Sequence, residues 1–294
     1  MKTIGITLGD QAGIGPEIIE AALKSGRLPA DCEYRIIGPK LDNVIPGKPT
    51  IETAQAALDG LEEAASLLKF GEIDGVVTGP IAKDALHDLG FSFPGQTEFF
   101  ATRLDVSNYA MCLSGKSLTV GLVTTHIAIS DVSSHLNRDE ITRIGNLLVD
   151  FCFKRGITSP AIAVCGLNPH CGENGAFGDE DQRIIQPAIN QLNFEYMPTD
   201  HTSSLLPPFS GPHAADTIFR PAVDGDYDAV LCMYHDQGLI PLKLLDFDTG
   251  VNITLGLPRP RTSPDHGTAF ALAGKGKASA ESMIHAIQMC VQLA

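Results

Sequence analysis

The chain has 294 residues, of which 44% are hydrophobic, and 35 acidic against 21 basic side chains give it a net charge of −14. This length is sufficient for one large or two medium α/β lobes. The negative charge argues against nucleic acid as the main partner, because phosphate contacts need a basic surface. No apolar run approaches the roughly 20 residues of a membrane span, and no signal-peptide cleavage pattern follows Met1. We therefore expect a cytoplasmic protein with no nucleic-acid and no membrane partner, although a few local Arg and Lys residues would suffice for an anionic substrate.

Runs typical of buried strands alternate along the chain with runs of helical periodicity, which predicts an α/β fold with a largely parallel sheet. We expect strands at 3–8, 34–38, 74–78, 109–113, 118–124, 161–166 and 228–233. We expect helices at 16–25, 53–69, 97–104, 138–154, 180–192 and 280–293. Pro16 suits the first turn of its helix, and Asn137 with Glu140 three residues later indicates a capping box.

The segment 206–213 has the composition of a linker, and a bend is expected near 91–95. We therefore expect two lobes, a discontinuous one of residues 1–92 plus 225–294 and a middle one of residues 93–224. The seven Cys are scattered without a C-x-x-C pair, which indicates reduced thiols in the core and argues against a closed zinc site.

Three expected strands each end close to a histidine. His126 follows 118–124, His170 follows 161–166, and His235 follows 228–233 within Tyr-His-Asp-Gln-Gly. Ligands bind at strand ends in open α/β sheets, and imidazoles there with open positions left for substrate would make a catalytic metal site. Imidazole suits zinc, cobalt, nickel, iron or manganese better than magnesium. A single such histidine can equally be a polar loop cap, and the remaining ones (His87, His135, His201, His213 and His285) are interpreted as surface or structural.

Two carboxylates, Asp236 and Asp216, are candidates for acid/base work or for orienting an imidazole. The alternative for Asp216 is a helix N-cap before Thr217. Lys243 is flanked by leucines on both sides, so we expect a buried stem and an aimed ammonium group that could move a proton. Together with Asn252, Arg259 and Arg261 it could hold a carboxylate or a phosphate, although a solvated surface charge is the default for any single one.

Two glycine-rich segments could approach a cofactor. Residues 9–17, Gly-Asp-Gln-Ala-Gly-Ile-Gly-Pro-Glu, follow the first strand and open the first helix, where backbone N–H groups favour anions. They match neither the Rossmann fingerprint nor a Walker loop, and a tight turn is the alternative. Residues 265–269, Asp-His-Gly-Thr-Ala, leave room for a flat ring or a phosphate, and His266 could stack on adenine. A helix cap is the alternative there.

In their order along the chain, these segments resemble the 4-hydroxythreonine-4-phosphate dehydrogenase family of pyridoxal phosphate biosynthesis. The similar segments are 9–17, 77–80, 97–101, 124–126, 166–173, 215–217, 233–238, 250–258 and 265–269. The resemblance implies a fold like that of isocitrate and isopropylmalate dehydrogenases, with two α/β/α lobes and a cleft between them. It also implies a homodimer with a shared active site, formed through the middle lobe.

The resemblance further implies the site residues. His126, His170 and His235 would bind a divalent metal (zinc, cobalt, manganese or magnesium), one of them from the partner subunit. Gln96, Thr97, Lys243, Asn252 and Arg261 would contact the phosphorylated substrate. Gly9, Asp10 and Gly13 would bind NAD or NADP together with Asp265, His266, Gly267 and Thr268. Lys243, Asp236 and Asp216 would carry the acid/base chemistry.

The expected reaction is oxidation of 4-phosphohydroxy-L-threonine to the 3-keto acid, which decarboxylates to 3-amino-2-oxopropyl phosphate. The chain departs from the family at Gln96, where the family usually has His, and it is short between Pro39 and Thr53. The alternative within the family is a catabolic 4-phospho-D-threonate or 4-phospho-D-erythronate 3-dehydrogenase. An aromatic dihydrodiol is less expected, because the phosphate-binding candidates are present. From other classes, a phosphate acyltransferase or a metal-dependent hydrolase remains open.

Overall fold

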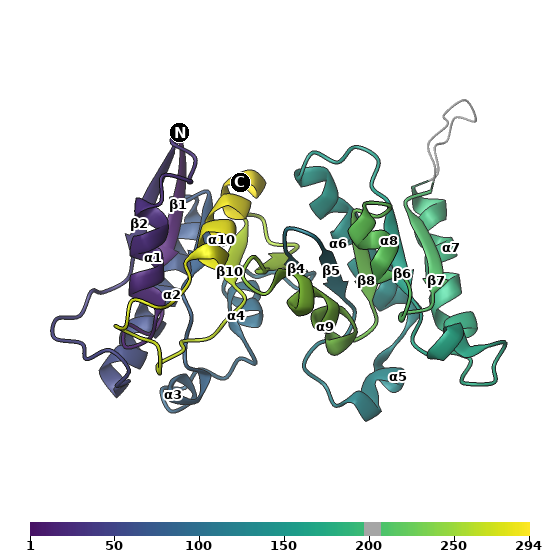
Figure 1. Cartoon of the computed structure of the whole chain (residues 1–294), viewed down its shortest axis with the longest axis horizontal. Coiled ribbons are helices and arrows are strands. Elements are labelled where there is room, and N and C mark those ends of the chain that lie inside the picture. The colour runs from purple at the N-terminus through teal and green to yellow at the C-terminus, as the bar shows by residue number, and fades with distance from the viewer. Residues whose placement is uncertain (197–206) are drawn as a thin grey trace. The chain divides into compact units, whose positions relative to one another are not determined.

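The computed structural model describes residues 1–196 and 207–294 (Figure 1). His201 and the first residue of the linker-like segment, Leu206, lie outside the described residues. The chain forms two compact units, which we call unit 1 (Met1–Ser107 and Asp248–Ala294) and unit 2 (Asn108–Phe247). No helix in the described ranges is both long enough and apolar enough to cross a membrane.

Unit 1 contains five strands in the order β2-β1-β3-β10-β9, parallel except for β9, which runs antiparallel to β10. Its strands are β1 (Lys2–Thr7), β2 (Cys32–Ile37), β3 (Gly75–Thr78), β9 (Val251–Leu255) and β10 (Arg261–Pro264). Its helices are α1 (Gly15–Lys24), α2 (Ile51–Phe70), α3 (Lys83–His87), α4 (Gln96–Arg103) and α10 (Glu281–Leu293).

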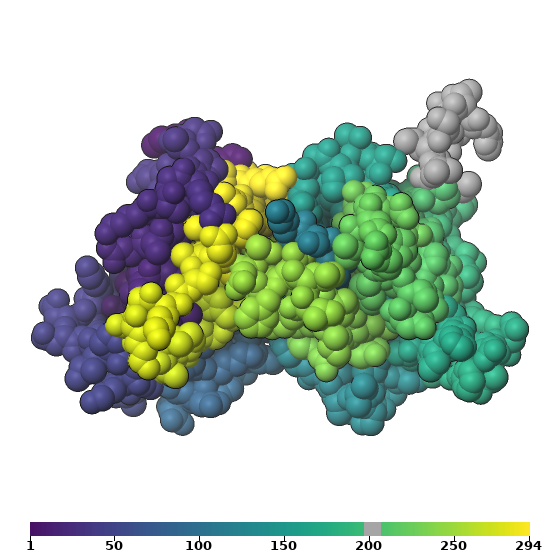
Figure 2. Space-filling view, viewed as in Figure 1, coloured from purple at the N-terminus to yellow at the C-terminus, as the bar shows by residue number. Residues whose placement is uncertain are grey.

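Helices cover these strands on both faces. Gly60 of α2 lies over Thr7, and Cys290 of α10 lies over Gly75. Gly75 is in register with Ile4, and side chains alternate along a strand, so Ile4 and Thr7 point to opposite faces. In the space-filling view the yellow C-terminal residues pack beside the purple N-terminal ones, as the contacts of α10 with α1 require (Figure 2).

Unit 2 contains five strands in the order β4-β5-β8-β6-β7, among which only the β4–β5 pair is antiparallel. Its strands are β4 (Ala110–Ser114), β5 (Thr119–Leu122), β6 (Ile162–Cys165), β7 (Phe209–His213) and β8 (Ala229–Cys232). Its helices are α5 (Val132–His135), α6 (Arg138–Lys154), α7 (Gln186–Glu195), α8 (Phe219–Asp224) and α9 (His235–Asp246), with short 3-10 turns at Ile129–Asp131 and Pro169–Gly172 and a π turn at Asp181–Ile185.

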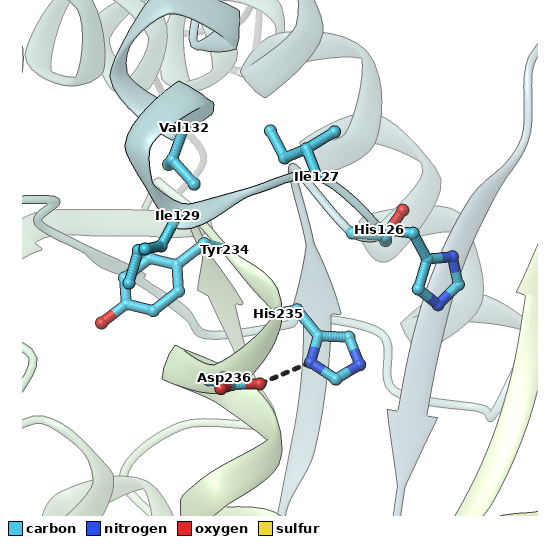
Figure 3. A pocket seen from close by; sticks show the side chains of 8 residues that line it. His126, Ile127, Ile129, Val132, Tyr234, His235 and Asp236 are labelled. Carbon is cyan, nitrogen blue, oxygen red and sulfur yellow. Dashed lines mark hydrogen bonds and ion pairs between the residues drawn. The ribbon is translucent and has the colours of Figure 1, made fainter.

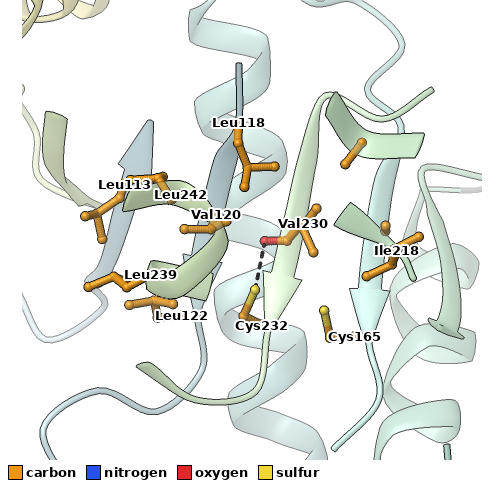
Figure 4. Close-up of a cluster of buried hydrophobic side chains, with 12 residues drawn as sticks. Leu113, Leu118, Val120, Leu122, Cys165, Ile218, Val230, Cys232, Leu239 and Leu242 are labelled. Atoms are coloured by element: carbon orange, nitrogen blue, oxygen red, sulfur yellow. Dashed lines mark hydrogen bonds between the residues drawn. The ribbon is translucent and has the colours of Figure 1, made fainter. Parts of the chain in front are cut away.

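The core of unit 2 shows how α9 is held (Figure 4). Val120 and Leu122 of β5 pack with Leu239 and Leu242 of α9 in one buried cluster. Gly121, which points to the opposite face, lies against Leu148 of α6. The strands are therefore covered on both sides, and only Met233 and Tyr234 separate the end of β8 from the start of α9.

All the expected strands and helices are found, with the helix at 180–192 divided into the π turn and α7. The linker interpretation of 206–213 is wrong, because Phe209–His213 form β7, paired with β6. The capping box at Asn137 is half present: Asn137 Oδ1 accepts from Glu140 N at 2.9 Å, but the Glu140 carboxylate binds Arg143 instead of the cap. Five cysteines are buried and all seven are free.

The two units differ in their limits from the lobes expected from the sequence. Helix α4 belongs to unit 1, because Arg103 pairs with Glu62 of α2 and Phe99 packs on Phe91. Strand β8 and helix α9 belong to unit 2, because β8 lies between β5 and β6.

Candidate active site

Two of the three candidate histidines lie together in unit 2 (Figure 3). His126 follows the end of β5, and His235 is the first residue of α9, so neighbouring parallel strands deliver both rings to the same edge of the sheet. Their ring centroids are 5.8 Å apart. They line a cavity of about 230 Å³ together with Thr125, Ile127, Ile129, Val132, Tyr234 and Asp236.

Asp236 fixes the orientation of the His235 ring. Its Oδ1 lies 2.7 Å from His235 Nδ1, and Figure 3 shows this bond on the side of the ring that faces away from His126. A carboxylate on Nδ1 holds the proton there and leaves the lone pair of Nε2 for another partner. This is how metal-binding histidines are commonly oriented.

His170 lies on a separate loop with an unusual backbone. His170, Cys171, Glu173 and Asn174 all have positive φ, between 43° and 57°, a conformation that non-glycine residues rarely adopt. The buried carboxylate of Asp181 supports this loop by accepting from Leu167 N at 2.8 Å and from the Asn168 side chain at 3.0 Å.

The structure therefore brings His126, His235 and Asp236 together but does not place His170 in their cavity. Within residues 1–196 and 207–294 no group of three or more His, Cys, Asp or Glu is arranged to hold a metal ion. The ring of His170 instead lies beside Phe177.

The expected burial of Lys243 is wrong. Lys243 is exposed on α9, because Leu239 and Leu242 face the core while Leu244, 83% exposed, points outward. The flanking leucines therefore do not enclose the lysine stem.

The N-cap alternative for Asp216 is also wrong, since α8 begins at Phe219 and its N-cap residue is Ile218. Asp216 is exposed and lies near the His170 loop, where it adds to the effect of burial and of Asp181 in raising the pKa of Cys171.

Unit 1 contains a buried cation among neutral partners. Arg261, only 3% exposed, donates from Nη2 to Thr78 Oγ1 at 2.7 Å and to Gln96 Oε1 at 3.0 Å. Burial lowers the pKa of Arg261 to about 10, against the opposing charge of Glu98. Arg261 Nε is buried with no hydrogen-bond partner among the described residues. A buried guanidinium with an unused donor is suited to a phosphate or a carboxylate.

Gln96 and its neighbours surround this guanidinium. Gln96 Nε2 donates to Gly79 O at 3.3 Å, so both ends of its amide are engaged. Asn252 Oδ1 lies 3.4 Å from Arg261 Nη1, and Thr97 Oγ1 lies 3.3 Å from Thr254 Oγ1. The structure thus unites four expected substrate-binding residues and adds two that were missed, Thr78 and Thr254. Thr254 stands two residues from Asn252 on the same strand face, a periodicity that could have revealed it.

The two glycine-rich segments meet in unit 1. Ile14 N donates to Thr268 O at 2.9 Å, and Asp10 N donates to Pro80 O at 2.9 Å. Gly9 has φ +69°, and a Cβ at Gly13 would lie 2.7 Å from Thr268 O. Both glycines are therefore required by conformation or by close approach.

This pair of loops contains unused polar atoms. Asp10 is 1% exposed; its Oδ1 accepts from Ala12 N at 3.0 Å, while its Oδ2 has no partner in the described part of the chain. His266 Nε2 is also buried and has no hydrogen-bond partner among the described residues. A Cβ at Gly267 would meet nothing within 4 Å, so the turn has open space above it. The loops offer an acceptor, a ring nitrogen and room for a ligand.

Comparison with known proteins gives the family. The model of the family described as pyridoxal phosphate biosynthetic protein PdxA matches residues 17–290. A 4-hydroxythreonine-4-phosphate dehydrogenase of Geobacter metallireducens is 41% identical over 99% of this chain and 95% of its own. A D-threonate 4-phosphate dehydrogenase of Pectobacterium atrosepticum is 40% identical over 100% and 99%.

Solved structures agree. The crystal structure of a 4-hydroxythreonine-4-phosphate dehydrogenase from Klebsiella pneumoniae superposes with a TM-score of 0.80 at 35% identity, covering 100% of this chain and 99% of that one. An isocitrate dehydrogenase from Methylococcus capsulatus, at 15% identity and a TM-score of 0.58 over 99% and 85% of the two chains, shares the fold. The expected isocitrate dehydrogenase-like fold class is confirmed, and the chain belongs to the PdxA family as one of its dehydrogenases.

Proposed function

We propose that the protein oxidises 4-phosphohydroxy-L-threonine with NAD⁺ or NADP⁺ and a divalent metal ion, giving a 3-keto acid that decarboxylates to 3-amino-2-oxopropyl phosphate. The observation that carries the proposal is the His126–His235 pair, with Asp236 on the far nitrogen of His235. The relatives named for this substrate support the choice.

The donor set fits a divalent metal ion. Two imidazoles from separate strand ends, one of them oriented by a carboxylate, form the type of incomplete ligand set that leaves positions for substrate. We propose His126, His170 and His235 as the ligands, with one of the three coming from the partner subunit. Zinc, cobalt and manganese suit this set, and magnesium suits it less.

The nicotinamide cofactor is proposed to bind at the paired loops 9–13 and 265–268. Asp10 Oδ2 is a buried acceptor suited to a hydroxyl group, and the open space over Gly267 admits a flat ring. When bound, the metal supplies a Lewis acid for the substrate hydroxyl, and the nicotinamide supplies the hydride acceptor.

The side chains of the chain perform the remaining tasks. Arg261 binds the substrate phosphate with the N–H donors of its guanidinium group. Its hydrogen-bond partners Thr78 and Gln96 are neutral, and its Nε donor has no partner among the described residues. Lys243, or Asp236 through a water molecule, accepts the proton of the substrate hydroxyl group as hydride leaves the carbon that bears this hydroxyl. Asp216 stays a candidate for acid/base work beside the His170 loop.

A second candidate substrate is 4-phospho-D-threonate. Gln96 occupies a position where the family usually has His, and an amide holds neither charge nor a transferable proton near neutral pH. A relative that is 40% identical to this chain carries the name D-threonate 4-phosphate dehydrogenase. The phosphate contact proposed for Arg261 serves both substrates.

We also propose that unit 2 forms the homodimer. Ile240 and Leu244 of α9 and its C-cap residue Phe247 are exposed, and their spacing places them along one side of the helix. An exposed apolar stripe of this kind is typical of an association surface. Sedimentation of Leu244→Glu against the unchanged protein would test it, with dissociation expected.

The reaction is tested with purified, metal-loaded protein, NAD⁺ or NADP⁺ and each phosphorylated substrate, by following the absorbance of the reduced cofactor. Turnover of 4-phosphohydroxy-L-threonine that disappears in His235→Ala supports the proposal. Turnover of 4-phospho-D-threonate alone would select the second candidate. Absence of reduction with either substrate, despite bound metal, would refute both.

A further inference from the structure

The ends of the three strands that precede the candidate histidines are joined through the backbone N–H and C=O of Met233 and the side-chain amide of Gln237. Met233 lies directly after β8, Gly166 directly after β6 and Thr124 two residues after β5. Gln237, 7% exposed, accepts at Oε1 from Met233 N at 2.7 Å and donates from Nε2 to Gly166 O at 2.8 Å. The carbonyl of Met233 in turn accepts from Thr124 N at 3.1 Å and from Thr124 Oγ1 at 2.8 Å.

The side-chain amide of Gln237 takes the place of backbone hydrogen bonds between the ends of β6 and β8. Strands β6 and β8 pair directly up to Val164 and Leu231. Beyond that point the Gln237 side chain is inserted between the two strand ends, accepting from one and donating to the other. Between β8 and β5 the ladder continues through backbone bonds, Val123 N to Cys232 O and Thr124 N to Met233 O.

Each bonded residue stands just before a candidate metal ligand. Thr124 precedes His126 by two residues, Met233 precedes His235 by two, and Gly166 precedes His170 by four. A displacement of any of these strand ends therefore moves a ligand.

Only an amide of this length fits the position. A carboxylate cannot donate to Gly166 O, and a hydrocarbon leaves both backbone groups unsatisfied. The helix approaches closely here, since a Cβ on Gly238 would lie 3.0 Å from Leu122 Cδ2 and 3.1 Å from Cys232 Sγ. Little room remains for water to replace the amide.

We infer that Gln237 is a positioning residue that sets the separation of the β5, β8 and β6 ends and thereby the affinity of the three histidines for a metal ion. The inference rests on the metal site of the proposed function. Gln237 is not itself a ligand, because both ends of its amide are used by the backbone.

A matched control exists at the outer edge of the same sheet. Asn193 also uses both ends of its side-chain amide on the backbone, but of a single residue, accepting from Phe209 N at 3.0 Å and donating to Phe209 O at 2.8 Å. It ties α7 to β7, which delivers none of the three histidines. Asn193→Leu therefore removes equivalent bonds without moving a ligand.

The experiment titrates the metal-free protein with Co²⁺, following the ligand-field absorption bands and the affinity by competition with a chromophoric chelator. Thermal unfolding of each metal-free variant is measured in parallel. Gln237→Met is expected to weaken Co²⁺ binding about 10- to 100-fold and to alter the absorption bands. Asn193→Leu is expected to lower the melting temperature while leaving the Co²⁺ affinity unchanged.

Unchanged affinity in Gln237→Met, or an equal loss in Asn193→Leu, would overturn the inference. If Gln237→Met does not fold, Thr124→Val is tested instead, because it removes the hydrogen bond from Thr124 Oγ1 to Met233 O. We expect the Co²⁺ affinity to fall about fivefold for the loss of one neutral hydrogen bond. An unchanged affinity would count against the inference. His235→Ala distinguishes a failure of the inference on Gln237 from a failure of the proposed metal site. If it binds Co²⁺ as tightly as the unchanged protein, the proposed metal site itself is wrong and the inference falls with it.

Discussion

Gly9 and Gly26 have nearly the same backbone conformation but different surroundings, so one substitution at each position separates conformational strain from steric conflict. Gly9 has φ +69° and Gly26 has φ +67°. A Cβ at Gly26 would meet nothing within 4 Å, whereas a Cβ at Gly9 would lie 2.2 Å from Pro80 O and 2.7 Å from Gly79 C.

The magnitudes follow from these distances. Gly26→Ala is expected to cost about 1 kcal/mol for holding alanine in the left-handed region. Gly9→Ala carries that cost and also requires the backbone to move by about 0.8 Å to restore a 3.0 Å contact, for which overpacking adds about 1–3 kcal/mol. We expect a total loss of about 2–4 kcal/mol in the free energy of unfolding.

The same movement should affect ligand binding. Gly79 O accepts the Gln96 amide, which in turn accepts from Arg261, and Pro80 O accepts from Asp10 N. Gly9→Ala should therefore raise the KM for the cofactor and for the phosphorylated substrate, while Gly26→Ala should change neither.

Urea unfolding of both variants and steady-state kinetics measure these effects. Equal losses of stability in the two variants would refute the steric argument. A destabilised Gly9→Ala with unchanged KM values would refute the link from the loop to the binding groups.

Four further outcomes are expected. Arg261→Lys keeps the charge but loses the fork that reaches Thr78 and Gln96, so kcat/KM for the phosphorylated substrate should fall about 5- to 150-fold, which corresponds to about 1–3 kcal/mol of transition-state stabilisation. An equal fall with a substrate lacking phosphate would contradict the phosphate role. Asp236→Ala should weaken Co²⁺ binding about 10- to 100-fold, measured by titration, with Asp216→Ala as the comparison. Burial lowers the pKa of His213 below 6.5, so the unfolded state binds the proton more readily than the folded state. The free energy of unfolding should therefore fall as the pH drops below about 6.5, and this pH dependence should be weaker in His213→Gln when both proteins are unfolded with urea. Iodoacetamide at pH 8 should modify Cys32 and Cys171, which are partly exposed, in the native protein. It should spare Cys152 and Cys290, which are buried and whose pKa values burial raises to about 12.

The elements that sequence reasoning predicted have a clean period, and two of those it missed, α9 and β7, contain residues that normally interrupt it. Helix α9 contains Gly238 and Pro241, both of which are typical of breaks. It forms nevertheless, because Leu239 and Leu242 bury against β5. Strand β7 contains the Gly211–Pro212 pair and was interpreted as a linker, yet it pairs at the edge of the sheet, where proline is tolerated.

These two misses explain the errors in the site. Without α9 the leucines around Lys243 suggested a buried stem, whereas a helical period places the lysine outside. The partners of Arg261 depend on the register of three strands, since Arg261 lies opposite Val76 on one side and Thr254 on the other. Register between distant strands has no local signal in a single sequence, so Thr78 and Thr254 were missed while the motif residues Gln96 and Asn252 were found.

The three histidines show where reasoning from strand ends stops. Ends of adjacent parallel strands bring their following residues to one edge, and this suffices for His126 and His235, whose strands β5 and β8 are neighbours. His170 follows β6, which also neighbours β8, but the left-handed run from His170 to Gly175 and the support of Asp181 direct its loop elsewhere in the single chain. A ligand set shared between two subunits requires this separation, because a third histidine in the same cavity would complete the site without a partner. We therefore expect the loop after β6 to set the position of His170, and Gln237 to set the separation of the strand ends. Substitutions at these two places should change metal affinity by separate routes and should be additive in free energy.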